Sequence, residues 1–281
     1  MDKQAGWFND PQLQRQFERA GYVVVDVLAP PALAQLRQTG EQLAPFHSTP
    51  FHSSIFTGDL AYRTGVSEQI EAALAPAVAR LFCDAQMAFS GYVTKQVDPA
   101  SFVGFHQDWS FVDEIRHEAA TLWAPLHDVD TRNGCLLVVP GSHKLNRQVR
   151  GFNTNFPYEA LIPTLLRKHT LAVPLRAGQA IIFSQRLFHA SNPNMGSRMR
   201  LCINTLVVPR SAQLYYNFVH GEGADLAGMV ECFAVDKAWY QTYQWGSCPP
   251  AEMRLSLSDE CCDPIGPDEL AGLPDIVAVP A

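Results

Sequence analysis

Two residues within the stretch "GFHQDWSF", His106 and Asp108, could bind a metal ion together. If this stretch is a strand, side chains two positions apart point to the same face and reach one ion. Neutral imidazole and carboxylate ligands suit non-haem Fe(II), because a two-His, one-carboxylate face leaves coordination positions open for reactants. Nine histidines and 28 acidic residues in 281 predict about one such pair by chance, so the spacing alone is weak evidence.

A third ligand and a fixed positive charge lie further along the chain. His189 follows the apolar run Gln179 to Ser184, and Arg200 begins a second apolar run, "RLCINTLVV". If these two runs are neighbouring strands, Arg200 faces the metal across a cavity and can form a bidentate pair with a carboxylate. Arg198 is the rival for that role. The second His-x-acid pair, His220 and Glu222, has no matching downstream histidine and arginine, and a surface loop is the favoured interpretation.

The hydrophobic pattern predicts the helices and strands that would position these residues. Residues 11–20 predict a helix that breaks at Gly21, Tyr22 to Val27 predicts a strand, and Pro30 begins the next helix. Short β-like runs then follow one another between turn residues, which predicts a barrel or sandwich. These runs are 87–94, 121–126, 135–139, 169–173, 179–184 and 199–208.

Several of these features occur together in a family-like order. The ordered features are His106-Gln107-Asp108, Trp123, "NGCLLVVPGSHK", "GQAIIF", His189-Ala190-Ser191-x-x-Asn194 and Arg200, and "FERAGYVVVDVL" precedes them. The set resembles the phytanoyl-CoA dioxygenase (PhyH) family of Fe(II)/2-oxoglutarate oxygenases. The resemblance implies a mainly β fold with flanking helices, whose core is a double-stranded β-helix of the jelly-roll or cupin-like kind.

The resemblance also implies a role for each site residue. His106, Asp108 and His189 match the iron ligands, and Arg200 matches the residue that binds the distal carboxylate of 2-oxoglutarate. Gln107, Trp123 and Ser191 match positions that line the cosubstrate pocket in some members. From their types alone, Trp123 could equally be a core aromatic, and Gln107 and Ser191 could serve only local polar groups.

The implied reaction is hydroxylation of an aliphatic C–H bond in a small organic molecule. It consumes O2 and 2-oxoglutarate and releases succinate and CO2. Asp108 favours hydroxylation over halogenation, because related halogenases replace this carboxylate with a small residue. Desaturation or ring formation at the same iron, or a cupin-like metal enzyme that does not use 2-oxoglutarate, are the alternatives.

We expect one oxygenase domain over 1–281. It divides into a helical and strand segment at 1–85, the β-helix core at 86–210 with an insertion at 143–170, and an acidic C-terminal extension at 211–281. The insertion has five basic residues against Glu159 and is long enough to be a lid over an anionic or acyl, amino-acid or natural-product-like substrate. A solvated basic face is the alternative interpretation.

Composition limits the partners and the compartment. The net charge is −7, and 211–281 holds eleven acids against Lys237 and Arg254, which argues against binding nucleic acid. The absence of a long apolar run and of a signal-peptide pattern predicts a cytoplasmic protein without membrane contact. We expect a monomer or a homodimer. Seven cysteines without a Cys-x-x-Cys pair predict reduced thiols. Cys248, Cys261 and Cys262 form either a zinc site or part of an ordinary C-terminal segment.

Overall fold

The computed structural model, which describes residues 6–43, 49–146, 148–221, 226, 228–259 and 265–276, begins with a helix, a strand and a second helix. Helix α1 (Pro11–Ala20) starts after Asp10, whose side chain accepts a hydrogen bond from the Gln12 amide, and ends at Gly21 with φ 81°. Strand β1 (Tyr22–Asp26) and helix α2 (Pro30–Leu43) follow. The predictions for these three elements are confirmed to within one residue.

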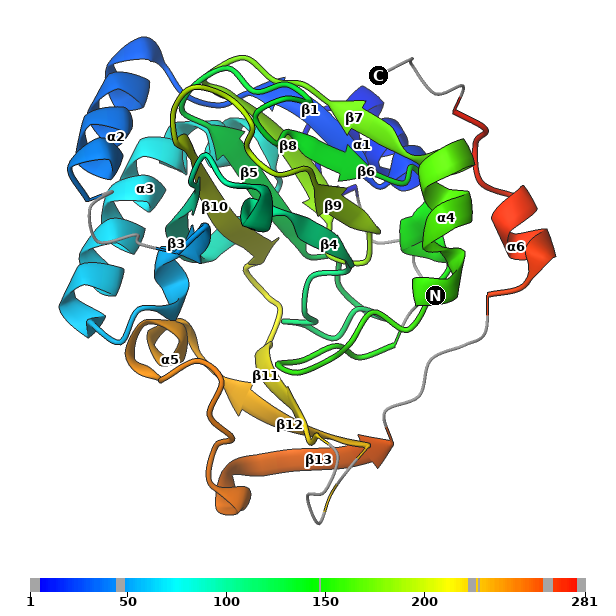
Figure 1. The fold of residues 1–281 in the computed structure, drawn as a ribbon. Coiled ribbons are helices and arrows are strands. Elements are labelled where there is room, and N and C mark those ends of the chain that lie inside the picture. Colours follow the sequence, from blue (N-terminus) through cyan, green and yellow to red (C-terminus); the bar gives the residue numbers. More distant parts are fainter. Residues whose placement is uncertain are drawn as a thin grey trace.

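The larger sheet has six antiparallel strands in the order β1-β8-β5-β10-β3-β2. The further strands are β2 (Phe51–Ser53), β3 (Ala85–Lys95), β5 (Ala120–Pro125), β8 (Gln179–Ser184) and β10 (Arg200–Pro209). Alternate residues of β10, Leu201, Ile203 and Val207, pack on the helical side of the sheet. Helix α3 (Leu60–Leu81), which was not predicted, contributes Ile70 and Leu74 to the same core and covers this face with α2 (Figure 1).

The smaller sheet faces the other side of the larger one. Its order is β4-β9-β6-β7, with β4 (Val103–His106), β6 (Leu136–Val138), β7 (Leu171–Val173) and β9 (His189–Ser191). Both sheets contribute to one buried cluster, in which Trp123, Ile181 and Cys202 of the larger sheet meet Leu136, Val138 and Val173 of the smaller. The predicted mainly β fold with a double-stranded β-helix core and flanking helices is confirmed.

Two connections differ from what the local sequence suggests. An Asn-Gly pair is typical of a tight hairpin, but the Asn133-Gly134 turn does not close one, because β5 and β6 on its two sides belong to different sheets. Strands β8 and β10 are not neighbours either, since β5 lies between them and pairs with both. Both arrangements depend on pairing between segments that are far apart in the sequence, which a local turn pattern does not predict.

The C-terminal residues form a separate three-stranded sheet below the core (Figure 1). It contains β11 (Leu214–Val219), β12 (Met229–Val235) and β13 (Arg254–Asp259). Helix α5 (Lys237–Thr242) connects it to the core through Tyr240, which packs with Phe89 and Phe111. The remaining short helical turns in this part are η7 (Ala251–Met253) and α6 (Pro267–Ala271).

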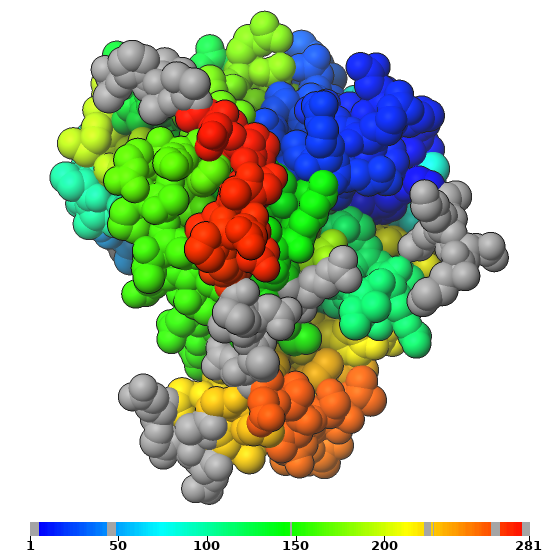
Figure 2. Space-filling view, turned by 90° about the vertical axis from the view of Figure 1, so that its right-hand side faces the viewer, coloured from blue at the N-terminus to red at the C-terminus, as the bar shows by residue number. Residues whose placement is uncertain are grey.

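The insertion contains short helical turns that pack beside the smaller sheet. They are η4 (Ser142–Lys144), η5 (Glu159–Leu161), α4 (Ile162–Thr164) and η6 (Leu165–His169), whereas η2 (Ser54–Phe56) and η3 (Pro99–Ser101) lie elsewhere. Tyr158 and Leu165 share a cluster with Phe188 and with Leu273, which follows α6. Figure 2 shows α6, in red, lying across the green surface of the insertion. Among the described residues, no helix combines the length and the apolar character that crossing a membrane requires.

We expect Gly21→Ala to destabilise the protein by roughly 1–3 kcal/mol, because Gly21 has a positive φ that side chains disfavour. A Cβ there would also lie 2.5 Å from Nδ1 of the buried His143. Denaturant unfolding followed by circular dichroism measures the change. Gly58→Ala, whose Cβ would meet no atom within 4 Å, is the control. Equal stability of the two variants would contradict this account of the α1–β1 turn.

Candidate active site

His106 and His189 form a cross-strand pair between β4 and β9. They are antiparallel partners, and their ring centroids lie 4.1 Å apart. Nδ1 of His106 lies 2.9 Å from the Gly104 carbonyl oxygen, and Nδ1 of His189 lies 2.9 Å from that of Leu187. When each Nδ1–H donates to its carbonyl, each Nε2 keeps its lone pair for a metal ion.

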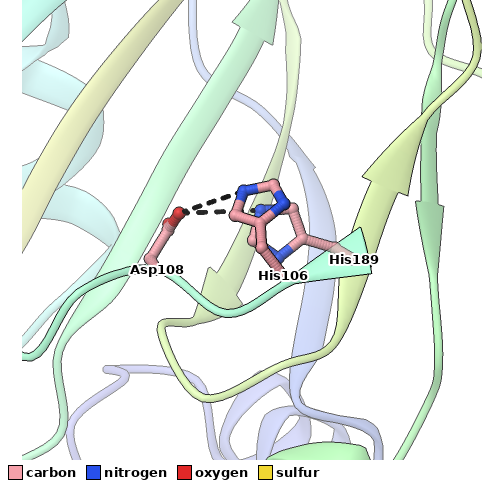
Figure 3. A group of neighbouring side chains, drawn as sticks. All are labelled: His106, Asp108 and His189. Carbon is pink, nitrogen blue, oxygen red and sulfur yellow. Dashed lines mark ion pairs between the residues drawn. The ribbon is translucent and has the colours of Figure 1, made fainter. Parts of the chain in front are cut away.

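Asp108 reaches the two histidines from a loop and not from a strand. Strand β4 ends at His106, so the predicted strand alternation between His106 and Asp108 is wrong. The Asp108 carbonyl accepts a 2.7 Å hydrogen bond from Arg150 Nε, which holds the chain away from the sheet. Its Oδ1 nevertheless lies 3.8 Å from His106 Nε2 and 3.6 Å from His189 Nε2 (Figure 3). The three side chains therefore converge as predicted, by a different backbone route.

The second carboxylate oxygen of Asp108 is engaged by the protein. Thr121 Oγ1 on β5 donates a short hydrogen bond to Asp108 Oδ2, which leaves Oδ1 directed at the histidines. Arg150, which holds the Asp108 backbone, is itself fixed by a 2.7 Å ion pair with Glu114. These contacts orient the carboxylate before any ion binds, as outer contacts do in metal sites generally.

The donor set fits a divalent iron ion. The ligand atoms of His106, Asp108 and His189 all lie within 4.8 Å of one another. Burial, with a smaller contribution from His106, lowers the pKa of His189 to about 4, so this imidazole is neutral near pH 7. Two imidazole nitrogens and one carboxylate oxygen on one side of an ion are the ligands that non-haem Fe(II) takes while other positions stay open.

Arg200 lies on β10, is buried and lines the same cavity as the three ligands. Its Nη1 donates a 2.6 Å hydrogen bond to the Gly134 carbonyl, and its guanidinium carbon lies 5.2 Å from the centre of the Trp123 ring. Its Nε is buried and has no hydrogen-bond partner among the described residues. A carboxylate would supply that partner, which fits 2-oxoglutarate. Arg198, the rival candidate, is exposed and does not line this cavity.

The glycine of the Asn133-Gly134 turn allows this Arg200 contact. Gly134 has φ 84°, and a Cβ at this position would lie 2.7 Å from the Asn192 carbonyl oxygen. Only glycine therefore brings the backbone close enough for its carbonyl to accept from Arg200.

The other predicted cosubstrate residues all line the cavity, in different ways. Trp123 is buried beneath Arg200, and Ser191 lies two residues after His189 on β9. The Gln107 amide is occupied by the protein, since it donates to the Arg186 carbonyl at 2.7 Å and accepts from Asn146 at 3.0 Å. Gln107 thus stabilises the wall of the cavity, because its amide nitrogen and its amide oxygen are both hydrogen-bonded to the protein.

The cavity has a volume of about 250 Å³ and connects the three ligands with Arg200. No described residue of the insertion 143–170 lines it. Arg150 is buried against Glu114, and Lys144 is exposed beside the Arg19 carbonyl. The predicted placement of these basic side chains over a substrate is therefore not seen for Lys144 and Arg150. His143 is buried against Glu18 and Gly21, away from the cavity.

Sequence reasoning missed Thr121, Lys95 and Asn204. Lys95 is fully buried, and its Nζ donates to the carbonyls of Ser191 at 3.1 Å and Asn192 at 2.7 Å. Burial and the nearby Arg200 lower the Lys95 pKa to about 6. Asn204 lines the cavity, and its Oδ1 has no partner among the described residues. These roles come from contacts between distant segments, and the local sequence gives no signal for them.

The alternative metal-site predictions involve residues of the C-terminal sheet. Glu222 lies outside the described residues, and His220 instead lies 2.7 Å from Glu231. Glu231 also pairs with Arg254 at 2.7 Å and accepts from the Cys248 thiol at 3.0 Å. Cys261 and Cys262, the other residues of the zinc hypothesis, lie outside the described residues.

Comparison with known proteins agrees with this geometry. The family model for phytanoyl-CoA dioxygenase (PhyH) matches residues 17–202. The chain therefore belongs to this family of Fe(II)/2-oxoglutarate-dependent oxygenases, and the resemblance noted in the sequence is confirmed.

Curated relatives match less than half of the chain. A phytanoyl-CoA dioxygenase of Arabidopsis thaliana is 34% identical over 122 residues, which are 42% of this chain and 43% of the relative. A phytanoyl-CoA dioxygenase domain-containing protein 1 of Bos taurus is 31% identical over 118 residues, 40% of each chain. The chain thus spans less than half the length of these relatives.

Solved structures share the fold at low identity. The α-ketoglutarate-dependent epimerase SnoN from nogalamycin biosynthesis has a TM-score of 0.55 at 21% identity, covering 94% of this chain and 96% of SnoN. EctD from S. alaskensis, solved with 2-oxoglutarate and 5-hydroxyectoine, has a TM-score of 0.52 at 21% identity, with coverage of 73% and 78%. These likenesses support the double-stranded β-helix assignment.

We expect Thr121→Val to weaken Fe(II) binding about tenfold, because Asp108 loses the hydrogen bond that directs its Oδ1. Competition with a coloured chelator under anaerobic conditions measures the affinity. Thr205→Val is the matched control, since Thr205 Oγ1 is buried in a hydrogen bond to Ser90 outside the cavity lining. Wild-type iron affinity in Thr121→Val would overturn this role.

Proposed function

We propose that this protein hydroxylates an aliphatic C–H bond of a small organic molecule, with Fe(II) and 2-oxoglutarate bound in the cavity between the two sheets. The observation that carries the proposal is the shared cavity. It joins three converging metal-ligand atoms to a buried arginine whose Nε has no partner among the described residues. Metal ligands alone would suit many metalloenzymes, whereas the added arginine suits a cosubstrate that carries a carboxylate.

In this proposal, each of the four titratable side chains of the cavity has one task. His106, His189 and Asp108 hold the iron, and Arg200 binds the distal carboxylate of 2-oxoglutarate. Iron, when bound, would supply O2 activation. One oxygen atom of O2 would enter succinate as 2-oxoglutarate loses CO2, and the other would enter the substrate as a hydroxyl group. Trp123 and Ser191 form the wall beside the cosubstrate.

The protein controls the polarity around these groups. Arg200 lies in a buried environment next to Lys95, and burial lowers the pKa of both groups. Bringing a carboxylate to Arg200 offsets the cost of keeping a guanidinium there without an anionic partner. The retained carboxylate of Asp108 occupies the position that a halide would need, so oxygen transfer is favoured over halogenation.

We expect Arg200→Ala to raise the KM for 2-oxoglutarate by about 10- to 100-fold, because a charge-assisted hydrogen-bonded pair is lost. The readout is succinate released by the iron-loaded protein in air, without added substrate. Arg198→Ala, which removes an exposed arginine two residues away, should leave this KM unchanged. An unchanged KM in Arg200→Ala would show that Arg200 does not bind 2-oxoglutarate. No succinate release by the iron-loaded wild-type protein would favour a metal enzyme that does not use this cosubstrate.

A further inference from the structure

One end of the cavity is built from aromatic side chains. Phe56, Phe89, Trp109 and Phe111 line it, and we call these four residues the aromatic end. Phe89 and Phe111 contact each other at 5.2 Å between ring centroids, and Phe56 and Trp109 at 6.1 Å. The rings come from η2, β3 and the loop that follows β4, so the larger sheet and the iron-ligand loop build this end together.

Trp245 of the C-terminal segment supports the aromatic end from behind. Its ring centroid lies 5.2 Å from Phe89, 5.6 Å from Trp109 and 5.8 Å from Phe56. The next residue, Gly246, has φ 87°, and a Cβ there would lie 2.8 Å from the Phe152 ring. Glycine is therefore required directly after Trp245, whose ring packs against the aromatic end.

A buried amide oxygen without a hydrogen-bond partner among the described residues lies beside the same end. Gln185 is 1% exposed and lines the cavity, and its Oε1 has no hydrogen-bond partner among the described residues. Its backbone amide donates to the carbonyl of Ala119, which belongs to the same buried cluster as Phe89 and Phe111. A buried amide oxygen left unpaired costs free energy, so a ligand that supplies the missing partner gains affinity and orientation.

The rest of the lining is uncharged. Asp108 and Arg200, together with the two histidines, are the charged or titratable side chains among the described lining residues, and the proposed function uses all four. At the mouth, Phe51 and Phe56 are 37% and 48% exposed and present apolar surface. An anion at the aromatic end would lose its hydration without gaining an opposite charge there.

We infer that the aromatic end binds an uncharged, planar ring system that carries a hydroxyl or amide N–H group for Gln185. The rings would stack among Phe56, Trp109 and Phe111, and this placement turns the other edge of the ligand toward Asp108 and the two histidines. This inference rests on the proposed function in one respect: Asp108 is taken to bind iron and Arg200 to bind the cosubstrate, so that neither is available to the substrate. It replaces the anionic substrate expected from the basic insertion.

Matched naphthalene derivatives test the inference. The ligands are 2-naphthol, naphthalene and 2-naphthoate, titrated against the metal-free full chain by quenching of tryptophan fluorescence. The comparison of 2-naphthol with 2-naphthoate is made in Arg200→Ala, where no arginine attracts the carboxylate. We expect 2-naphthol to bind about 3- to 10-fold more tightly than naphthalene, the range of one neutral hydrogen bond. In Arg200→Ala, 2-naphthoate should bind at least about tenfold more weakly than 2-naphthol. Binding of 2-naphthoate to this variant as tight as that of 2-naphthol, or tighter, would overturn the inference.

Variants of Gln185 locate the hydrogen bond. Gln185→Met should reduce 2-naphthol affinity to that of naphthalene and leave naphthalene affinity unchanged. Gln148→Met is the control, because Gln148 Oε1 is also buried without a partner among the described residues but lies outside the cavity lining. Equal 2-naphthol affinity in Gln185→Met and wild type would contradict the assignment. If Gln185→Met does not fold, the wild-type preference for 2-naphthol over naphthalene decides the question.

The two proposals fail separately. Ligand selectivity is measured without iron, whereas the proposed function is measured as succinate release without added substrate. Loss of succinate release with selectivity intact would refute the oxygenase assignment and leave the ligand class standing. Succinate release without 2-naphthol selectivity would refute the ligand class alone.

Discussion

The antiparallel pairing of His106 with His189 is the constraint on which the rest of the site depends. Strands β4 and β9 are short, and their register brings together two histidines that are far apart in the chain. Because each Nδ1 faces the carbonyl two residues earlier, both Nε2 atoms point to the same space. Asp108 must then be carried to that space from a loop, which Arg150 and Thr121 hold from two other segments.

The cavity separates charge from apolar surface. Its charged part contains Asp108 and Arg200, and behind it Lys95 fixes the Ser191 and Asn192 carbonyls at the end of β9. The part lined by Phe56, Trp109 and Phe111 is neutral and is supported by Trp245 from the C-terminal segment. In the proposed function, charged reactants and an apolar ligand would bind side by side, because each part offers the interactions that the other lacks.

The sequence pattern predicted those elements whose limits are set by neighbouring residues, such as capping and turn residues. Helix α1 ends at Gly21, and strands such as β8 agree with the sequence pattern because turn residues bound their apolar runs. His106, Asp108 and His189, which converge in the cavity, were predicted as iron ligands from their types and from their order in the family resemblance. Asp108 lies outside the strand, where its carbonyl binds Arg150, and Arg150 is in turn paired with Glu114 and unavailable to a substrate. Each of these contacts joins residues that are far apart in the sequence. Helix α3 was missed because Gly65 and Pro76 interrupt its pattern, although Ile70 and Leu74 pack in the core.

Anaerobic titration of the iron-loaded protein with 2-oxoglutarate tests the central claim most directly. If the two histidines and Asp108 hold Fe(II) beside Arg200, the account predicts a weak visible charge-transfer band that saturates at one equivalent. The band should be lost in His106→Ala and kept in His220→Ala, whose histidine pairs with Glu231 in the C-terminal sheet. A wild-type protein that binds one iron per chain and shows no band would contradict the account.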